Sequence, residues 1–188
     1  MRQGFRRPGA PQRHGGGFGG PLHLALRFLG STLALPVRRS ELAWVANHLR
    51  GGEWALWLRQ TRADKRHTLG VARRIQRAGL GKDAVAAALV HDVGKTQSGL
   101  GVAARVAVTL AALVLGRQNI LERAQRRGGS RLQRAAEYLR HDELGAAMLQ
   151  AAGARRMAIA WAGGHHSPAD IPGIPAEIAE ALRLADGD

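Results

Sequence analysis

One short segment of the sequence, residues 90–95 (Val-His-Asp-Val-Gly-Lys), brings an imidazole, a carboxylate and an ammonium group together. The segment ends an apolar run, and burying an imidazole and a carboxylate there is costly unless each has a partner. A divalent cation is a suitable partner because it accepts nitrogen and oxygen ligands together. Adjacent helical residues point about 100° apart, so both side chains reach one ion only near a helix end, which Gly94 permits. Asp92 and Lys95 are the candidate catalytic residues, with Lys95 as a point charge for a phosphate oxygen.

The sequence holds further residues of the same chemical types, in the order His67, His141, His165, His166 and Asp186. Each also has an ordinary interpretation. A lone helical histidine is often half-exposed, His141 could be a helix-cap variant, and one histidine of the adjacent pair could orient a ligand instead of binding the metal. His91 and Asp92 could themselves be a satisfied polar pair at a helix C-terminus. The ordered set favours a metal site over these separate explanations.

The order His67, then His91-Asp92, then Asp186 resembles the HD superfamily of metal-dependent phosphohydrolases, whose pattern is H…HD…D. Residues 67–72 look like that family's first-ligand helix, 87–95 are similar to its hallmark helix end, and 184–186 resemble its closing segment. The resemblance covers about residues 55–188. It implies that His67, His91, Asp92 and Asp186 hold one metal.

Residues 141–149 and 164–168 resemble segments of the dinuclear members, HD-GYP-like and YqeK-like proteins. This resemblance implies that Asp92 bridges to a second metal held by His141, His165 and, as a further candidate, His166. The Gly-Tyr-Pro element of HD-GYP proteins is absent, and residues 171–175 (Ile-Pro-Gly-Ile-Pro) stand in that region. Its absence argues against cyclic di-GMP as the substrate and leaves phosphohydrolysis in general intact.

The expected function is therefore a metal-dependent phosphohydrolase, a phosphomonoesterase or phosphodiesterase, whose partner is a phosphorylated small molecule, in the first place a nucleotide. With no cysteine in the chain, one or two divalent ions must be held by His, Asp and Glu, which leaves Mn, Fe, Mg or Zn open. The alternative is an HD-type metal-binding signalling or membrane-associated interaction module with little or no catalysis. The sequence identifies neither the oligomeric state nor the general acid.

The elements that must position these residues are helical by pattern. Apolar residues recur at helical spacing and no alternating strand pattern of useful length appears, so we expect an all-α fold, a compact HD-domain helical bundle. Asp64 is the expected N-cap of the helix that carries His67, and Gly51-Gly52 are expected to interrupt a helix. The run 84–90 is apolar on every side, which predicts a central helix. Helices are expected at 41–49, 53–60, 65–78, 84–90, 102–115, 131–139, 142–151, 154–163 and 176–185.

Charge separates the two ends of the 188-residue chain. Its net charge is +14, and residues 1–39 carry seven arginines and no acid. We expect residues 1–39 to form a basic, Gly/Arg/Pro-rich and amphipathic extension, partly disordered, and residues 40–188 to form the HD domain. The apolar stretch 102–115 is too short for a membrane span and is expected to be a core or interfacial helix. A cytoplasmic protein with peripheral contact to an anionic membrane follows, whereas sparse aromatic residues argue against nucleic acid.

Overall fold

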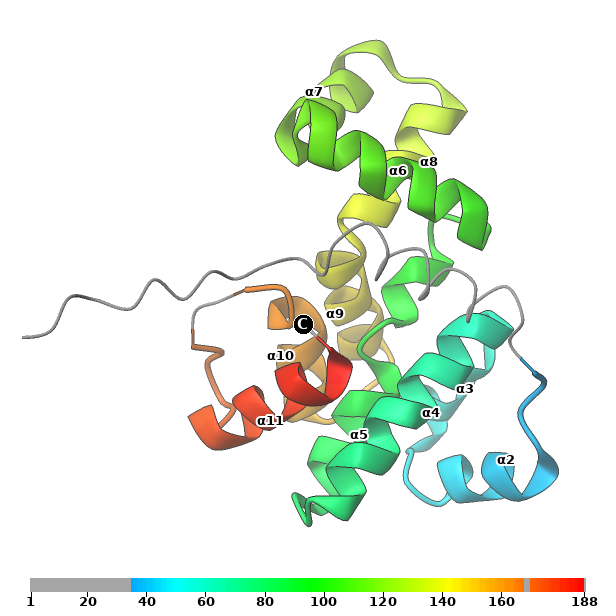
Figure 1. Ribbon diagram of the computed structural model, residues 1–188, viewed down its shortest axis with the longest axis vertical. Helices are drawn as coiled ribbons and strands as arrows, with labels where there is room; N and C mark the ends of the chain where they lie inside the picture. Colours follow the sequence, from blue (N-terminus) through cyan, green and yellow to red (C-terminus); the bar gives the residue numbers. More distant parts are fainter. Residues whose placement is uncertain (1–34, 168–169, 188) are drawn as a thin grey trace, which may run out of the picture.

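The computed structural model describes residues 35–167 and 170–187, and these contain helices and no strand. The prediction of an all-α fold is confirmed (Figure 1). The first elements are α2 (Arg39–Ala46), α3 (Gly51–Leu58), α4 (Arg62–Arg77), α5 (Gly81–Val90) and the short 3-10 helix η1 (Val93–Thr96). They are followed by α6 (Val102–Leu115), α7 (Arg117–Arg127), α8 (Ser130–Leu139), α9 (His141–Ala151), α10 (Arg156–Gly164) and α11 (Ala176–Asp186).

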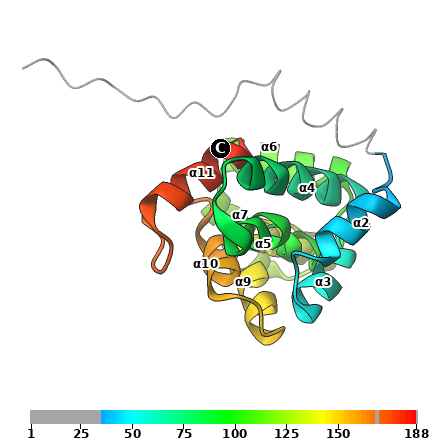
Figure 2. The ribbon, with the colours of Figure 1, turned by 90° about the horizontal axis from the view of Figure 1, so that it is seen from below.

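The centre of the bundle is α5, as its all-round apolar sequence predicts. Every residue from Ala84 to Val90 is at most 2% exposed. In Figure 2, α4 and α11 lie on one side of α5, and α9 and α10 lie on the other. Large side chains from the surrounding helices, Trp57, Leu69, Leu149, Trp161 and Leu182, complete this core. The end of α5 therefore lies in the middle of the molecule, where ligands from several helices can converge.

Two local expectations at the N-terminal side of the bundle are corrected by the structure. The N-cap of α4 is Thr61, whose hydroxyl accepts a hydrogen bond from the Asp64 amide at 3.2 Å, and Asp64 lies inside the first turn. The expected break between two helices is present, but it lies at residues 47–50, and Gly51 and Gly52 begin α3. A Cβ on Gly52 would lie 2.2 Å from the Ala152 carbonyl oxygen, so this glycine allows the close packing of α3 on α9.

The 102–115 helix, expected to be a core or interfacial helix, does not belong to the core. Its bounds are as predicted, but its one buried residue is Arg105. No single helix in the described part of the chain has the length and hydropathy needed to cross a membrane; α6 and α7 reach them only as a pair, which is bent by 107°. The division of the chain after residue 39 stays a prediction, since residues 1–34 lie outside the described residues.

Candidate metal centre

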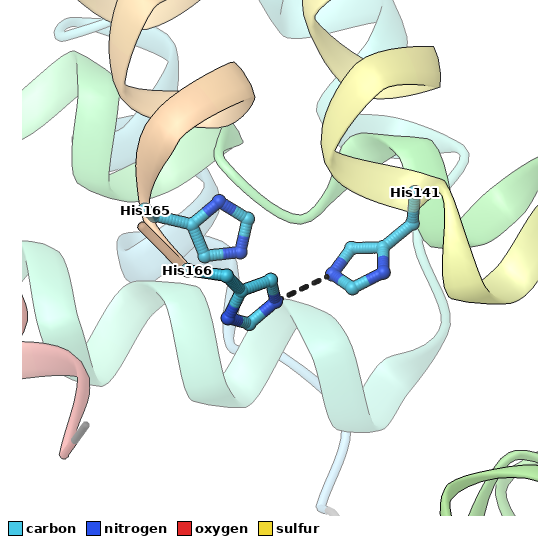
Figure 3. A group of neighbouring side chains, drawn as sticks. All are labelled: His141, His165 and His166. Carbon is cyan, nitrogen blue, oxygen red and sulfur yellow. Dashed lines mark hydrogen bonds between the residues drawn. The ribbon is translucent and has the colours of Figure 1, made fainter. Parts of the chain in front are cut away.

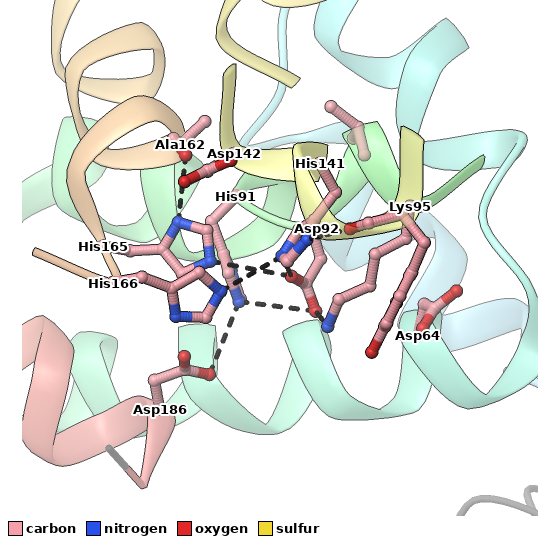
Figure 4. A network of polar contacts seen from close by, with 12 residues as sticks. Asp64, His91, Asp92, Lys95, His141, Asp142, Ala162, His165, His166 and Asp186 are labelled. Atoms are coloured by element: carbon pink, nitrogen blue, oxygen red, sulfur yellow. Dashed lines mark hydrogen bonds and ion pairs between the residues drawn. The ribbon is translucent and has the colours of Figure 1, made fainter. Parts of the chain in front are cut away.

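The predicted site residues converge from five helices on the end of α5. Figure 4 shows seven of them: His91, Asp92, Lys95, His141, His165, His166 and Asp186. His67 comes from the second turn of α4, and His91 and Asp92 follow α5 directly. The remaining ligand candidates stand at helix ends: His141 begins α9, His165 and His166 follow α10, and Asp186 ends α11. Residues separated by up to 119 positions in the chain, from His67 to Asp186, thus meet in one cluster.

The first group of ligand atoms comes from His67, His91 and Asp92, whose candidate atoms all lie within 4.8 Å of one another. Asp186 closes this group: its Oδ1 lies 2.7 Å from His67 Nε2 and 3.4 Å from His91 Nε2. Two imidazoles and two carboxylates form a nitrogen and oxygen donor set that suits a divalent transition metal.

The second group comes from His141, His165 and His166, and its ligand atoms also lie within 4.8 Å of one another (Figure 3). His166 Nε2 lies 3.1 Å from His141 Nε2. His141 and His165 are buried, whereas His166 is exposed. An all-imidazole group of this kind also suits a transition metal.

Asp92 stands between the two groups, with one carboxylate oxygen toward each. Its Oδ2 lies 3.6 Å from His91 Nε2 and 3.9 Å from His67 Nε2. Its Oδ1 lies 3.8 Å from His141 Nε2 and 3.9 Å from His165 Nε2. These separations exceed hydrogen-bond length, so each oxygen faces two imidazole nitrogens without bonding to them.

Three of the histidines are oriented by the same local device. The Nδ1 of His91, of His141 and of His165 contacts the carbonyl oxygen three residues earlier, at 3.0, 2.8 and 2.9 Å. A carbonyl only accepts, so Nδ1 must carry the proton and Nε2 is left to bind a metal. A backbone carbonyl that fixes the tautomer in this way is common for metal-ligating histidines.

Two of those Nε2 atoms are buried without a hydrogen-bond partner among the described residues: those of His91 and His165. A buried polar atom with no partner carries a desolvation cost, which a metal ion would remove. The donor set, the fixed tautomers and the unpartnered nitrogens all fit a metal centre.

The electrostatics of the cluster keep most of its ligands in the form that a metal needs. Burial, together with the nearby charge of Lys95, holds the pKa of His141 well below its usual range, and burial with the neighbouring imidazoles lowers the pKa of His165 to about 4. Burial favours the protonated form of Asp92, but Lys95 and the histidines outweigh it and hold the pKa of that carboxyl well below its usual range.

His91 behaves differently from the other two buried imidazoles. Burial disfavours its charged form, yet the carboxylates of Asp92 and Asp186 together outweigh burial and raise the pKa of His91 to about 9. In the metal-free protein this imidazole is therefore protonated at neutral pH, and it shares the charge-neutralising role with Lys95.

Lys95 lies within the 3-10 helix η1, and its Nζ stands 2.6 Å from Asp92 Oδ2. Burial opposes its charge, but the Asp92 carboxylate raises the pKa of Lys95. About a fifth of the side chain is exposed (21%). The ammonium is therefore charged, and it lies beside the carboxylate that stands between the two ligand groups.

Two glycines bring η1 against the start of α9. A Cβ on Gly94 would lie 1.9 Å from the His141 carbonyl oxygen and 2.6 Å from the Gly145 amide nitrogen. A Cβ on Gly145 would in turn lie 3.2 Å from the Gly94 nitrogen. Gly94 is thus needed for a close backbone approach that sets the distance between Asp92 and His141, and not chiefly for ending a helix.

Arg105 is a structural residue that the sequence pattern did not single out. Its Nη1 donates to both carboxylate oxygens of Asp64, at 2.9 and 2.8 Å, and its Nη2 donates to the Lys95 carbonyl oxygen at 3.2 Å. A lone arginine in an otherwise uncharged apolar helix is the signal that could have identified it. This contact ties α6 and α4 to the segment that carries Lys95.

The chain belongs to the HD-domain family: the family model described as HD domain matches residues 65–187. The match begins just before His67 and ends just after Asp186, so it contains every candidate ligand. Members of this superfamily are generally metal-dependent phosphohydrolases. No curated protein and no solved structure matches the chain.

Proposed function

We propose that this HD-domain protein is a phosphohydrolase with two divalent metal sites that share Asp92. In this proposal His67, His91, Asp92 and Asp186 hold one ion, and Asp92 with His141 and His165 holds the other, which His166 supports from the exposed side. The observation that carries it is the position of Asp92, whose Oδ2 faces His67 and His91 and whose Oδ1 faces His141 and His165. A dinuclear set also agrees with the resemblance to the HD-GYP-like and YqeK-like members.

Bound divalent ions lower the pKa of a coordinated water and polarise a phosphoryl oxygen. The residues of the chain supply the rest. The backbone carbonyls behind His91, His141 and His165 hold each Nε2 toward the cluster, so little reorganisation is needed when charge develops. Lys95 keeps a charged ammonium beside Asp92, where it can neutralise negative charge on a phosphate oxygen.

The substrate we propose is a phosphorylated small molecule, in the first place a nucleotide or dinucleotide. The centre contains candidate metal ligands and one ammonium group. These groups would recognise the phosphate, and they do not determine which group the phosphate is attached to. The absent Gly-Tyr-Pro element argues against cyclic di-GMP within this class.

The test combines metal analysis with a substrate panel. Purified chain, loaded with Mn or Fe, is assayed on a generic phosphodiester, a generic phosphomonoester, nucleotides and dinucleoside polyphosphates. We expect bound metal and turnover, and His91→Ala should abolish both. His48→Ala is a matched control, because His48 lies on the N-terminal side of the bundle with its Nδ1 on the Trp44 carbonyl.

The second candidate is a metal-binding interaction module with little catalysis, and the exposed apolar surface of α6 favours it. The same experiment separates the two. Metal bound in stoichiometric amount without turnover on any phosphoester in the panel would favour the module and contradict the phosphohydrolase.

A further inference from the structure

The composition of α6 favours buried apolar side chains and an exposed arginine, and the structure shows the reverse. Apart from Arg105 and Thr109, its 14 residues are alanine, valine and leucine, yet Arg105 is its one buried residue. Ala103, Ala107, Leu110 and Val114 recur at spacings of four, three and four, which sets them on one face, and all four are exposed. Val114 is 83% exposed and Leu113 54%. A contiguous apolar face of this kind marks an interaction surface.

Basic residues follow α6 along the chain. Gly116, with φ of +83°, ends α6, and α7 leaves at a bend of 107°. The side chains of Arg123 and Arg127 on α7 and of Arg131 at the start of α8 are exposed and make no hydrogen bond or ion pair with any described residue. Glu122, the single acid of α6 and α7, is paired with Arg126 at 2.7 Å. In Figure 1, α6, α7 and α8 form a lobe at one end of the molecule, beyond η1 and α9.

We propose that this lobe, residues 102–139, docks on an anionic lipid surface, with the exposed face of α6 lying in the headgroup region and the arginines of α7 and α8 on lipid phosphates. The inference goes beyond the phosphohydrolase function and does not depend on it. Helices that lie in a membrane interface combine an apolar face with Arg or Lys beside it, and each basic residue near an anionic leaflet strengthens binding.

Charge argues for lipid over the competing occupants of the apolar face. A second copy of the chain carries the same net charge of +14 and would bring its own arginines against those of α7. The chain's N-terminal residues 1–34 carry five arginines and no acid, so they would also meet like charge. An anionic membrane satisfies both the apolar face and the guanidinium groups.

Membrane docking of α6 is also connected to the metal centre, because Arg105 of α6 contacts residues close to the candidate ligands. The guanidinium of Arg105 contacts Asp64, one turn before His67, and the carbonyl oxygen of Lys95. One face of α6 would therefore contact the lipid, while Arg105 of the same helix contacts the segment that carries Lys95.

The experiment uses the full chain, whose lack of cysteine allows single fluorescent labels. Val114→Cys and Leu58→Cys are each labelled with an environment-sensitive dye. Leu58, 43% exposed on α3, serves as the control position. The probes are vesicles of phosphatidylcholine alone and vesicles of equal parts phosphatidylcholine and phosphatidylglycerol. We expect the emission of the Val114 label to shift to shorter wavelength on the anionic vesicles only, and the Leu58 label to stay unchanged.

Unlabelled variants test the two components of the surface by vesicle sedimentation. Leu113→Asn with Val114→Asn keeps the charge and should lower vesicle affinity at least tenfold, whereas Leu58→Asn should have no effect. Arg123→Gln with Arg127→Gln should lower it about 25-fold, at about fivefold per arginine. Arg59→Gln with Arg62→Gln removes the same charge elsewhere and should have a smaller effect.

Three results would overturn the proposal. The first is no binding of the wild-type chain to anionic vesicles. The second is binding that the two Asn substitutions leave unchanged, which would mean that the arginines alone act as a polyanion site. The third is a wild-type dimer that the Asn substitutions convert to a monomer, since α6 would then be covered by a second copy.

Discussion

The Nζ of Lys95 lies 2.6 Å from Oδ2 of Asp92, the carboxylate oxygen that also faces His67 and His91. A fixed positive charge thus stands where the proposed metal would bind its shared ligand. The charge of Lys95 therefore has two opposite effects: it repels a metal ion and it attracts a phosphate.

Replacing Lys95 by Gln separates these two consequences. We expect metal affinity to stay equal or rise, because a cation that competes for Asp92 is removed, and kcat to fall by about 10²–10³-fold, the usual loss for one charge-stabilising group. Metal titration and steady-state kinetics on a phosphodiester measure the two quantities. A variant that loses metal and activity together would show that Lys95 supports the site structurally instead.

Metal affinity should depend on pH through His91. Its carboxylate neighbours raise its pKa to about 9, so the imidazole is protonated below that pH and must lose its proton to bind a metal. Affinity should therefore rise about tenfold per pH unit from neutral pH toward 9 and then level off. Mn titrations across this range, at constant ionic strength, measure the slope, and an affinity independent of pH would contradict the assignment of His91 as a ligand.

The same pKa predicts the pH dependence of stability in the metal-free protein. The folded-state pKa lies above the ordinary value of 6.5, so the stabilising contribution of charged His91 is fully present below about 6.5. It is lost as pH rises through about 9. Metal loading should remove this loss, because the ligand then needs no proton.

His165 and His166 should differ as ligands although they are adjacent. His165 Nε2 is buried, lacks a hydrogen-bond partner among the described residues and lies 3.9 Å from Asp92 Oδ1, whereas His166 is exposed. We expect His165→Ala to abolish binding at the second site, and His166→Ala to weaken it by about 10–100-fold, as for a supporting residue. Metal counts per chain at equal free metal decide between them, and equal losses would contradict the distinction.

A methyl group at position 94 should disturb the metal centre by pushing the start of α9, which carries His141, away from η1. Gly94→Ala would place a Cβ against the His141 carbonyl oxygen, and overpacking of this kind costs about 1–3 kcal/mol of unfolding free energy. We also expect weaker metal binding, because η1 and α9 must separate. Gly101→Ala is the control, since nothing lies within 4 Å of its Cβ. Thermal unfolding of both variants tests this, and equal melting temperatures would contradict it.

Much of this fold is predictable because its signals are local. The apolar run that ends at Val90 specifies a helix buried on every side, and the helix 102–115 has the bounds that its pattern indicates. The order of His67, His91, Asp92 and Asp186 likewise survives as one group of neighbouring side chains. The helices depend on residue types within one or two turns, whereas the ligand order was predicted from the resemblance to the HD superfamily.

What the sequence did not predict depends on contacts between distant segments. The exposure of α6 follows from how few helices cover it, which no pattern within residues 102–115 encodes. The need for glycine at position 94 arises from the His141 backbone 47 positions away. The contact of Arg105 with Asp64 likewise joins residues 41 positions apart. The opposite orientation of the two Asp92 oxygens is also a tertiary property.

Electron paramagnetic resonance of the chain loaded with Mn²⁺ tests directly whether two metal ions share the Asp92 carboxylate. We expect about two Mn²⁺ per chain at saturation and a spectrum of two exchange-coupled ions. Removing the second-site ligand in His165→Ala should leave about one ion with an uncoupled spectrum. Uncoupled signals at full loading of the wild-type chain, or no bound metal at all, would contradict the shared role of Asp92.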